Sequence, residues 1–176
     1  RDSSLGAIRP DLEQVWKTSN EVASICYAVA KQAFGRQPDE AMMAGLLHSI
    51  GRLYILMHAH QNDPTIREDP SFADTLETWQ PVIGKAILEA WGLPQRICEA
   101  VENQDYLLGG GSADLEPLTR LLSAAKLRHR LDVEPELRLQ HPDAEFLLNS
   151  VNLGKGSFMD LVAVSQTDRE TMQQAL

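Results

Sequence analysis

His48 is the side chain of this sequence best suited by type and setting to carry chemistry. It lies in an apolar run without proline, residues 41–57, and its neighbour Ser49 carries no charge. Imidazole binds a divalent metal when carboxylates or further imidazoles complete the ligand set. The remaining histidines show no ligand spacing with an acidic partner on a helix; they are His58, His60, His129 and His141. We therefore predict no catalytic residue, no cofactor-binding residue and no metal ligand, and we interpret His48 as a hydrogen-bonded histidine of the core.

The two cysteines, Cys26 and Cys98, are the candidate nucleophiles. A thiol becomes reactive when a neighbouring base or cation lowers its pKa. The sequence places no activating base beside either cysteine, and both lie in apolar helical contexts. We therefore expect reduced, buried thiols in a cytoplasmic protein.

Two stretches have a composition that could suit phosphate groups. Residues 109–111 are three glycines, but the Lys-Ser or Lys-Thr ending of a nucleotide-cradling loop is missing. Residues 126–130 read Lys-Leu-Arg-His-Arg, which we interpret as a helix C-terminus, where cations suit the helix dipole. The net charge of −9 argues against broad binding of nucleic acid, which needs clustered Lys and Arg.

The length and composition fit one globular domain. The chain has 176 residues, of which 43% are hydrophobic and 23% charged. No apolar run approaches the ~20 residues of a membrane span, and the start has no signal-peptide pattern. We therefore expect a cytoplasmic protein that does not contact the membrane. Arg1 is not an initiator, so we expect the chain to begin inside a longer protein.

The apolar periodicity predicts an all-α fold, because no alternating strand pattern of useful length is present. Asp11 can cap the first helix and Gly35 suits its exit. Pro81 fits a first helical turn, Gly92 a helix end and Ser157 a cap. The expected helices cover residues 11–34, 41–57, 72–79, 81–91, 94–104, 115–131 and 143–153, followed by a last helix from Ser157.

The helix expected over residues 41–57 has two different faces. A stripe at spacings of three and four is expected to be buried: Met43, Leu47, Ile50, Tyr54 and Met57. The other flank is made largely of small residues around the histidine: Ala44, His48, Gly51 and Ile55. That flank leaves room for another helix or a ligand to come close. We also expect Trp91 to anchor the packing of two helices in the core.

Three landmarks make this sequence resemble the HD-related output domain, HDOD, of bacterial signalling proteins. They are Trp16-Lys17-Thr18-Ser19 before the Val22-Ala23 helix; residues 44–51 with the string GLLHSIG; and Val82-Ile83-Gly84 through Leu88, followed by Trp91-Gly92-Leu93-Pro94 and Ile97. The resemblance is strongest over residues 12–131. It implies a compact multi-helix bundle of the HD superfamily type, with residues 1–176 forming a single domain of a longer signalling protein.

The resemblance also implies where the metal ligands of catalytic HD proteins would lie. The first-helix histidine place holds Thr18, and the His-Asp pair reads His48-Ser49. The later aspartate place falls near Ala125-Lys126. Two further histidine places hold Gln80 and Asn103-Gln104. One ligand of the set remains, so the resemblance implies a non-catalytic member.

We therefore expect a signalling output or scaffolding domain of a bacterial regulatory protein, of the response-regulator kind. Its partners would be other signalling proteins, including an upstream receiver or sensor domain. Two alternatives stay open. One is a sensor that binds a nucleotide or another small molecule in the old pocket, where Arg52, Lys85 or Lys126 could help. The other is a metal-dependent phosphohydrolase with unusual ligands.

Overall fold

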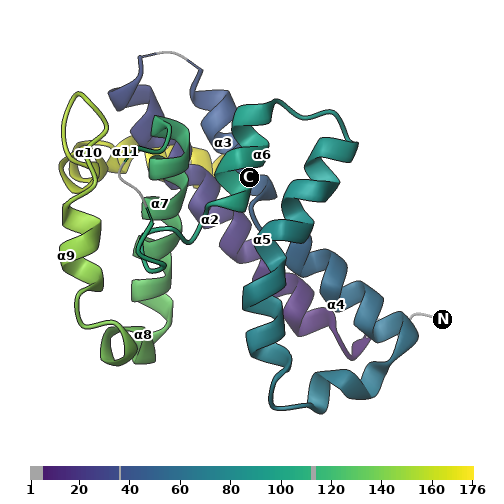
Figure 1. Cartoon of the computed structure of the whole chain (residues 1–176). Coiled ribbons are helices and arrows are strands. Elements are labelled where there is room, and N and C mark those ends of the chain that lie inside the picture. The colour runs from purple at the N-terminus through teal and green to yellow at the C-terminus, as the bar shows by residue number, and fades with distance from the viewer. Residues whose placement is uncertain (1–5, 36, 112–113) are drawn as a thin grey trace.

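The computed structural model describes residues 6–35, 37–111 and 114–176, and within these ranges helices are joined by turns and loops (Figure 1). The elements in chain order are α2 (Arg9–Ala33), α3 (Pro38–Leu47), α4 (Ile50–Asn62), the 3-10 helix η1 (Pro64–Glu68), α5 (Phe72–Ala90), α6 (Gln95–Glu102), α7 (Pro117–Val133), α8 (Pro135–Gln140), α9 (Ala144–Asn149), α10 (Phe158–Val164) and α11 (Gln166–Ala175). In the described ranges β-pairing is limited to one isolated bridge, Asn152 with Ser157. The all-α prediction is confirmed.

The apolar run over residues 41–57 forms two helices rather than the single helix expected. Helix α3 ends at Leu47, α4 begins at Ile50, and the backbone between them leaves helical geometry at Ser49, with φ −101° and ψ 13°. The ring of His48 bonds to the carbonyl of Gly45, which a continuous helix would use for a backbone bond four residues along. Apolar spacing alone does not reveal such a break.

Two glycines set how closely these helices approach their neighbours. A Cβ atom built on Gly45 would lie 2.5 Å from the Cα of Ala23 on α2. A Cβ on Gly51 would meet the backbone of Gln80 and lie 2.7 Å from the amide nitrogen of Gly84 on α5. The small-residue flank therefore admits other helices, as expected. The opposite stripe was expected to be buried, which is wrong for Met43 and Tyr54, because both side chains are exposed.

Helix α5 runs through Pro81, so the prediction of two helices, 72–79 and 81–91, is wrong. Its inner face recurs every four residues across the proline, and this face is buried: Phe72, Leu76, Gln80, Gly84 and Leu88. Packing of that face outweighs the missing N–H of one proline. The role expected for Trp91 is also wrong, since its side chain is 60% exposed. Gly92 ends the helix with a φ of +75°, as expected.

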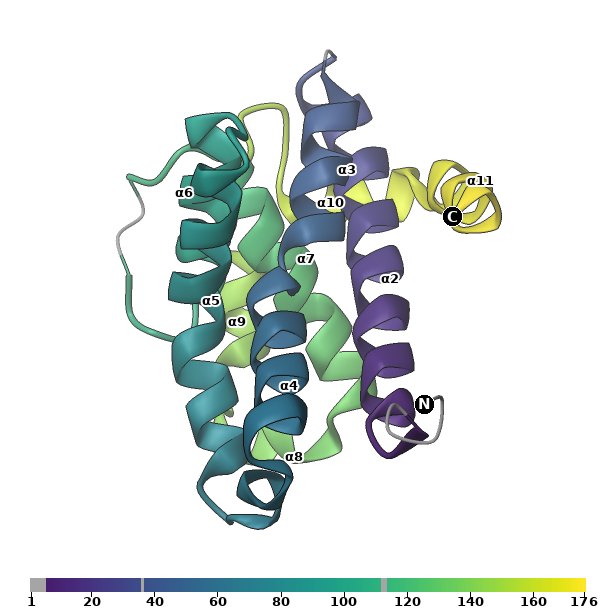
Figure 2. The same cartoon turned by 90° about the vertical axis from the view of Figure 1, so that its right-hand side faces the viewer.

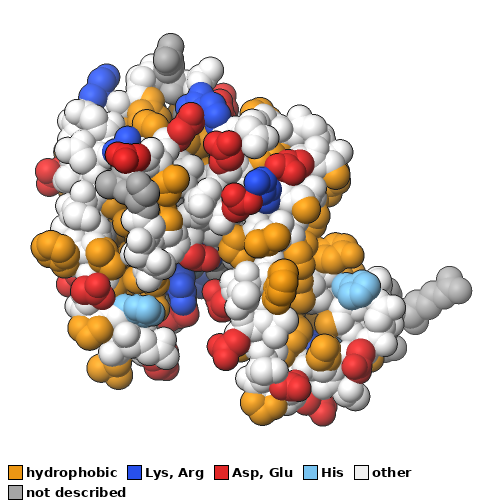
Figure 3. Space-filling model, in the orientation of Figure 1, with side chains coloured by type: hydrophobic (Ala, Val, Ile, Leu, Met, Phe, Trp, Pro, Cys, Tyr) orange, Lys and Arg blue, Asp and Glu red, His pale blue; other side chains and the backbone are white. Residues whose placement is uncertain are grey.

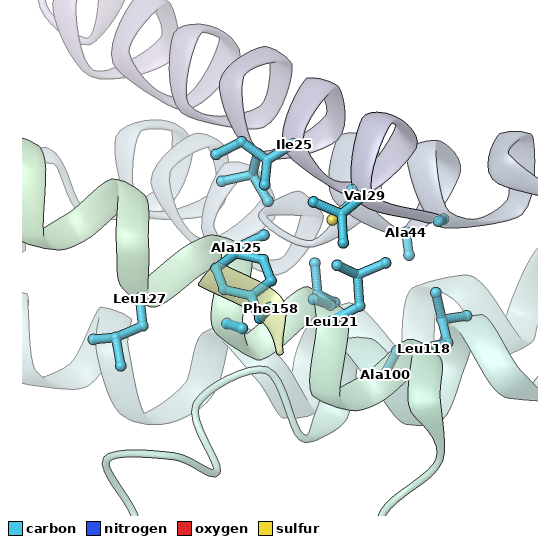
Figure 4. Close-up of a cluster of buried hydrophobic side chains, with 14 of the residues drawn as sticks. Ile25, Val29, Ala44, Ala100, Leu118, Leu121, Ala125, Leu127 and Phe158 are labelled. Atoms are coloured by element: carbon cyan, nitrogen blue, oxygen red, sulfur yellow. The ribbon is translucent and has the colours of Figure 1, made fainter. Parts of the chain in front are cut away.

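The main core lies where α2, α3, α6, α7 and α10 meet. Figure 4 shows Ile25 and Val29 of α2 above Leu121 and Ala125 of α7, with Phe158 close to Ala125. A second, smaller apolar cluster, made of Leu56, Ala59, Phe72 and Leu76, joins α4 to α5. Figures 1 and 2 both place α4 and α5 side by side.

At the remaining helix ends, one prediction is confirmed and the others are corrected. Ser157 caps α10 as expected, since its Oγ accepts from the Asp160 amide at 3.2 Å. The helix expected over residues 143–153 ends at Asn149, and the last helix divides at Ser165 into α10 and α11. Asp11 lies inside the first turn of α2, where Ile8 is the N-cap, and its carboxylate pairs with Arg67.

Candidate functional site

A cleft separates α7 from the pair α4 and α5, and Figure 3 shows it as a hollow between the two sides of the molecule. Its volume is about 510 Å³. Helix α2 and the break between α3 and α4 complete its wall. The lining residues are Gln14, Val15, Lys17, Thr18, His48, Ser49, Arg52, Glu77, Gln80, Lys126, His129, Arg130, Val133 and Glu134.

The positions that the HD resemblance marked as former ligand places converge on this cleft. Thr18, His48, Ser49, Gln80 and Lys126 all line it. Gln104 lies behind them in a buried network, whereas Asn103 donates to the Glu99 carbonyl of its own helix at 2.9 Å. Residues far apart in the sequence therefore meet as the resemblance implied, with Asn103 and Ala125 outside the lining.

The His48 ring is fully buried and both of its nitrogens have partners. Nδ1 lies 2.6 Å from the Gly45 carbonyl oxygen, so Nδ1 carries the proton and donates it. Nε2 then accepts from the Ser49 hydroxyl at 3.0 Å. Burial lowers the pKa of His48 to about 4, and the charge of Lys126 acts in the same direction. His48 is thus the neutral, hydrogen-bonded core histidine that we expected.

Gln104 connects three parts of the site. Its Nε2 donates to the carbonyls of His48 at 2.9 Å and of Val101 at 2.8 Å. Its Oε1 accepts from Gln80 Nε2 at 2.9 Å and from Lys126 Nζ at 2.8 Å. Two backbone carbonyls fix which end of the Gln104 amide is the amino group. The other end must then be the acceptor for Gln80 and Lys126.

Sequence reasoning missed two carboxylates that support the site from behind. Asp105 lies 2.8 Å from the Lys126 ammonium, and Glu21 on α2 lies 2.8 Å from Nδ1 of His129. Neither belongs to one of the three landmarks of the HDOD resemblance. A buried lysine and a buried histidine each call for such a partner, but burial of these two cannot be read from local spacing.

The basic stretch 126–130 was interpreted as a helix C-terminus that suits the dipole, and this is wrong for two of its members. Lys126 and His129 turn into the protein and are 5% and 4% exposed. Arg130 bonds to Glu134 at 2.8 Å, in the last turn of α7. Burial lowers the pKa of His129 below its ordinary value, although Glu21 opposes the shift.

The three cations named for a sensing pocket do not lie together. Arg52 lines the cleft and bonds to Glu77 at 2.8 Å, and Lys126 lies on the opposite wall. Lys85 lies outside the lining and pairs with Glu102 at 2.7 Å. Cys26 and Cys98 lie outside it too, and burial raises the pKa of the Cys26 thiol.

The donor set of the cleft does not fit a divalent metal. Such an ion needs several oxygen, nitrogen or sulfur ligands that converge. Within the described residues, no group of three His, Cys, Asp or Glu side chains could hold one. The lone pair of His48 Nε2 already accepts from Ser49, and the ammonium of Lys126 would repel a cation.

No helix in the described ranges combines the length and the apolar character needed to cross a membrane.

Comparison with known proteins places this geometry in a family. No curated protein matches the chain. A crystal structure from Shewanella amazonensis SB2B, named "putative metal-dependent phosphohydrolase", superposes with a TM-score of 0.61 at 19% identity. The alignment covers 92% of this chain and 61% of that one, so this chain spans less than two thirds of its length; at this identity the likeness concerns the fold. The family model of the HDOD domain matches residues 3–107, and the chain therefore belongs to the HDOD family.

Proposed function

We propose that this domain is a non-catalytic output or scaffolding domain of a bacterial signalling protein and that it acts in the cytoplasm. The observation that carries the proposal is the place of Lys126. Its ammonium lies 2.8 Å from Gln104 Oε1, in the group of residues where catalytic HD proteins would bind metal. A lysine ammonium fixed at this place can stabilise the fold, but its positive charge would repel a divalent metal ion.

Contact with other proteins is the mode of action that the surface supports. Exposed apolar side chains gather over α4 and α5 (Figure 3). We use the name hairpin surface for the exposed large side chains of α4, of α5 and of its C-cap: Tyr54, Trp79, Val82 and Trp91, each more than half exposed. Large aromatic side chains are enriched where proteins bind one another. The partners would be other signalling proteins, including an upstream receiver or sensor domain of the response-regulator kind.

The enzymatic alternative is tested by an activity assay. We expect no turnover of cyclic dinucleotides or nucleoside phosphates with added manganese. The name of the Shewanella structure makes metal-dependent phosphate release the reaction to assay. Turnover that His48→Ala abolishes in a protein that remains folded would overturn the non-catalytic proposal.

Affinity capture from the full-length protein tests the contact. The wild-type bait is compared with a Tyr54→Ser, Trp79→Ser double variant. Leu139→Ser on α8 is the matched control, since Leu139 is also exposed but lies outside the hairpin surface. We expect partners to be lost from the double variant alone. Equal capture by all three baits would show that this surface has no part in binding.

A further inference from the structure

Residues 50–80, which comprise α4, η1 and α5 up to Pro81, form a small body of their own beside the cleft. Their buried side chains make the second apolar cluster, which is separate from the main core. Helix α7, on the other side of the cleft, packs on α2, α3 and α6. Among the described residues, no hydrogen bond or ion pair joins residues 50–80 to residues 117–176. This segment can therefore move relative to α7 without breaking a bond to it.

The segment is connected to the main core at two points where the helical backbone is interrupted. The first is the break at Ser49, between the end of α3 and the start of α4. The second is Pro81, which has no N–H to donate to the carbonyl four residues earlier. Gly51 lies against the main chain of Gln80 and Gly84, so the two points are neighbours in space. Helices bend at such breaks and prolines, and both strands of the segment can therefore bend at one level.

An attachment at the far end of α4 restricts the direction of the bend. Arg67 of η1 donates to the Ala7 carbonyl at 3.3 Å and pairs with Asp11 on α2. The crossing at Gly51 and the contacts of Arg67 thus hold the two ends of α4. The motion that they permit turns the segment about α4 and carries the first half of α5 across the hollow in Figure 3, toward α7.

Each of the two facing walls carries an arginine paired with an acid. Arg52 and Glu77 lie 2.8 Å apart on the wall formed by α4 and α5, and Arg130 and Glu134 lie 2.8 Å apart at the end of α7. All four residues line the cleft. The side chains of Glu77 and Glu134 are 46% and 44% exposed, so both pairs are solvated and contribute little to stability. Exchange of partners between the walls therefore costs little.

Glu77 already acts on the arginine of the opposite wall. Burial acts against the charge of Arg130, but its hydrogen bond to Glu134 and the charges of Glu134 and Glu77 raise its pKa. Glu77 thus attracts Arg130 across the cleft, while its own hydrogen bond goes to Arg52. The attraction between an acid and a cation strengthens as they approach and water leaves the space between them.

We propose that residues 50–80 form a lid that closes on α7 over the cleft, and that Glu77 exchanges Arg52 for Arg130 when the lid closes. The structure has the open arrangement, in which Glu77 bonds to Arg52. In the closed arrangement Glu77 bridges the cleft and the lid covers Val133, which is 48% exposed in the lining. Part of the hairpin surface lies on the lid and moves with it. Closure is a property of the fold and does not depend on the contact proposed at that surface.

Distances between two spin labels on the whole protein test the closure. One label is attached to Thr75→Cys on α5 and the other to Gln140→Cys on α8, which packs on α7; both positions are exposed. The native Cys26 and Cys98 are buried, so the labels go to the introduced cysteines. Double electron–electron resonance should give two distance populations, and the shorter one is the closed arrangement.

Two arginine variants should shift these populations in opposite directions. Arg52→Gln removes the partner of Glu77 in the open arrangement and should raise the ratio of closed to open. Arg130→Gln removes the partner in the closed arrangement and should lower that ratio. Each shift should be about 1.5- to fivefold, the effect of one solvent-exposed ion pair. Lys31→Gln removes the exposed pair with Asp168 outside the cleft and should leave the ratio unchanged.

Arg130→Lys keeps the positive charge and should restore much of the closed population that Arg130→Gln loses. One distance population in both the wild type and Arg52→Gln would overturn the proposal. Shifts of the same sign in Arg52→Gln and Arg130→Gln would also overturn it, because loss of a charge and not exchange of a partner would then set the ratio. Circular dichroism shows whether each variant is folded. If Arg130→Gln is not, Arg52→Gln decides, since an unchanged or lower ratio there contradicts the exchange.

Discussion

The ammonium of Lys126 and the carboxylate of Asp105 lie 2.8 Å apart and join α7 to the segment that follows α6. The lysine side chain is 7% exposed and the aspartate side chain 34% exposed, so one partner is buried and the other reaches solvent. The same ammonium donates to Gln104, which holds Gln80 and the His48 carbonyl. A single protein cation thus ties together helices that are distant in sequence.

Lys126→Met should therefore destabilise the domain. The change leaves Asp105 without its partner and removes one of two donors to Gln104 Oε1. We expect a loss of about 2–3 kcal/mol in the free energy of unfolding, below the cost for a fully buried pair because Asp105 is partly solvated. Urea denaturation measures it. Lys85→Met is the matched control, since the pair of Lys85 with Glu102 is more exposed and should contribute much less to stability.

Ser49→Asp should not create a metal site. The carboxylate would add one ligand at a buried position and would remove the hydroxyl that donates to His48 Nε2. Thr18 offers a weak neutral oxygen and Lys126 offers a positive charge. We expect stability to fall or stay unchanged, with no gain in metal affinity. Calorimetric titration with manganese and iron checks this.

Micromolar or tighter metal binding by Ser49→Asp alone would contradict the assignment of the former ligand places. The smallest set with a chance of binding adds Thr18→His and Lys126→Asp. This triple variant is the positive comparison for the titration, because it supplies three protein ligands beside His48.

The buried His48 should make stability depend on pH. Its folded pKa is lowered to about 4 from the ordinary value of 6.5, so between these values the unfolded chain binds more protons. Stability is then fully present above pH 6.5 and is lost as the pH falls toward 4. From pH 7 to about pH 5 we expect His48 to account for a loss of about 2 kcal/mol.

Urea denaturation of the wild type and of His48→Gln at both pH values isolates this contribution. His129, whose pKa is lowered too, and the carboxylates remain in both proteins and drop out of the comparison. If both proteins lose the same stability on acidification, His48 does not stay neutral. An NMR titration that shows the His48 ring protonated near pH 6 would establish the same point without a variant.

Trp91→Ala should have little effect on stability. A tryptophan in a core would cost ~3–5 kcal/mol when truncated, but this side chain is 60% exposed. We expect a change below about 1 kcal/mol. Leu88→Ala, one turn earlier and fully buried, is the comparison and should cost about 2–5 kcal/mol. Equal shifts of the two denaturation midpoints would mean that Trp91 packs against the protein.

The sequence predicted the kind of the elements better than their number and continuity. Apolar periodicity located α2, α6 and α7 closely, because each has a strong inward face between clear end signals. The sequence predicted α3 and α4 as one helix and α5 as two helices that meet at Pro81. The actual boundaries depend on tertiary contacts, which the apolar spacing does not show. The hydrogen bond from the His48 ring to the Gly45 carbonyl accompanies the end of α3. Packing against α4 stabilises α5 as one helix through Pro81.

The sequence predicted which positions form the candidate site, but it did not predict which side chains bond to one another there. The motif comparison brought together Thr18, His48 and Lys126, which do line one cleft. It could not reveal Asp105 or Glu21, because a partner is defined by distance in space. Nor could it show that Gln80 and His129 each keep one atom unpaired, since that follows only from the bonds made by their other atoms.

Two glycines, Gly45 and Gly51, lie where helices of this domain approach each other closely. At Gly45 and Gly51 the helices are spaced by main chain against main chain, where any added Cβ would collide. The neighbouring main chain belongs to Ala23 at Gly45, and at Gly51 it belongs to Gln80, whose side chain lines the cleft, and to Gly84. Substitutions among the side chains that line the cleft therefore leave the contacts at these two crossings unchanged, because main-chain atoms make them.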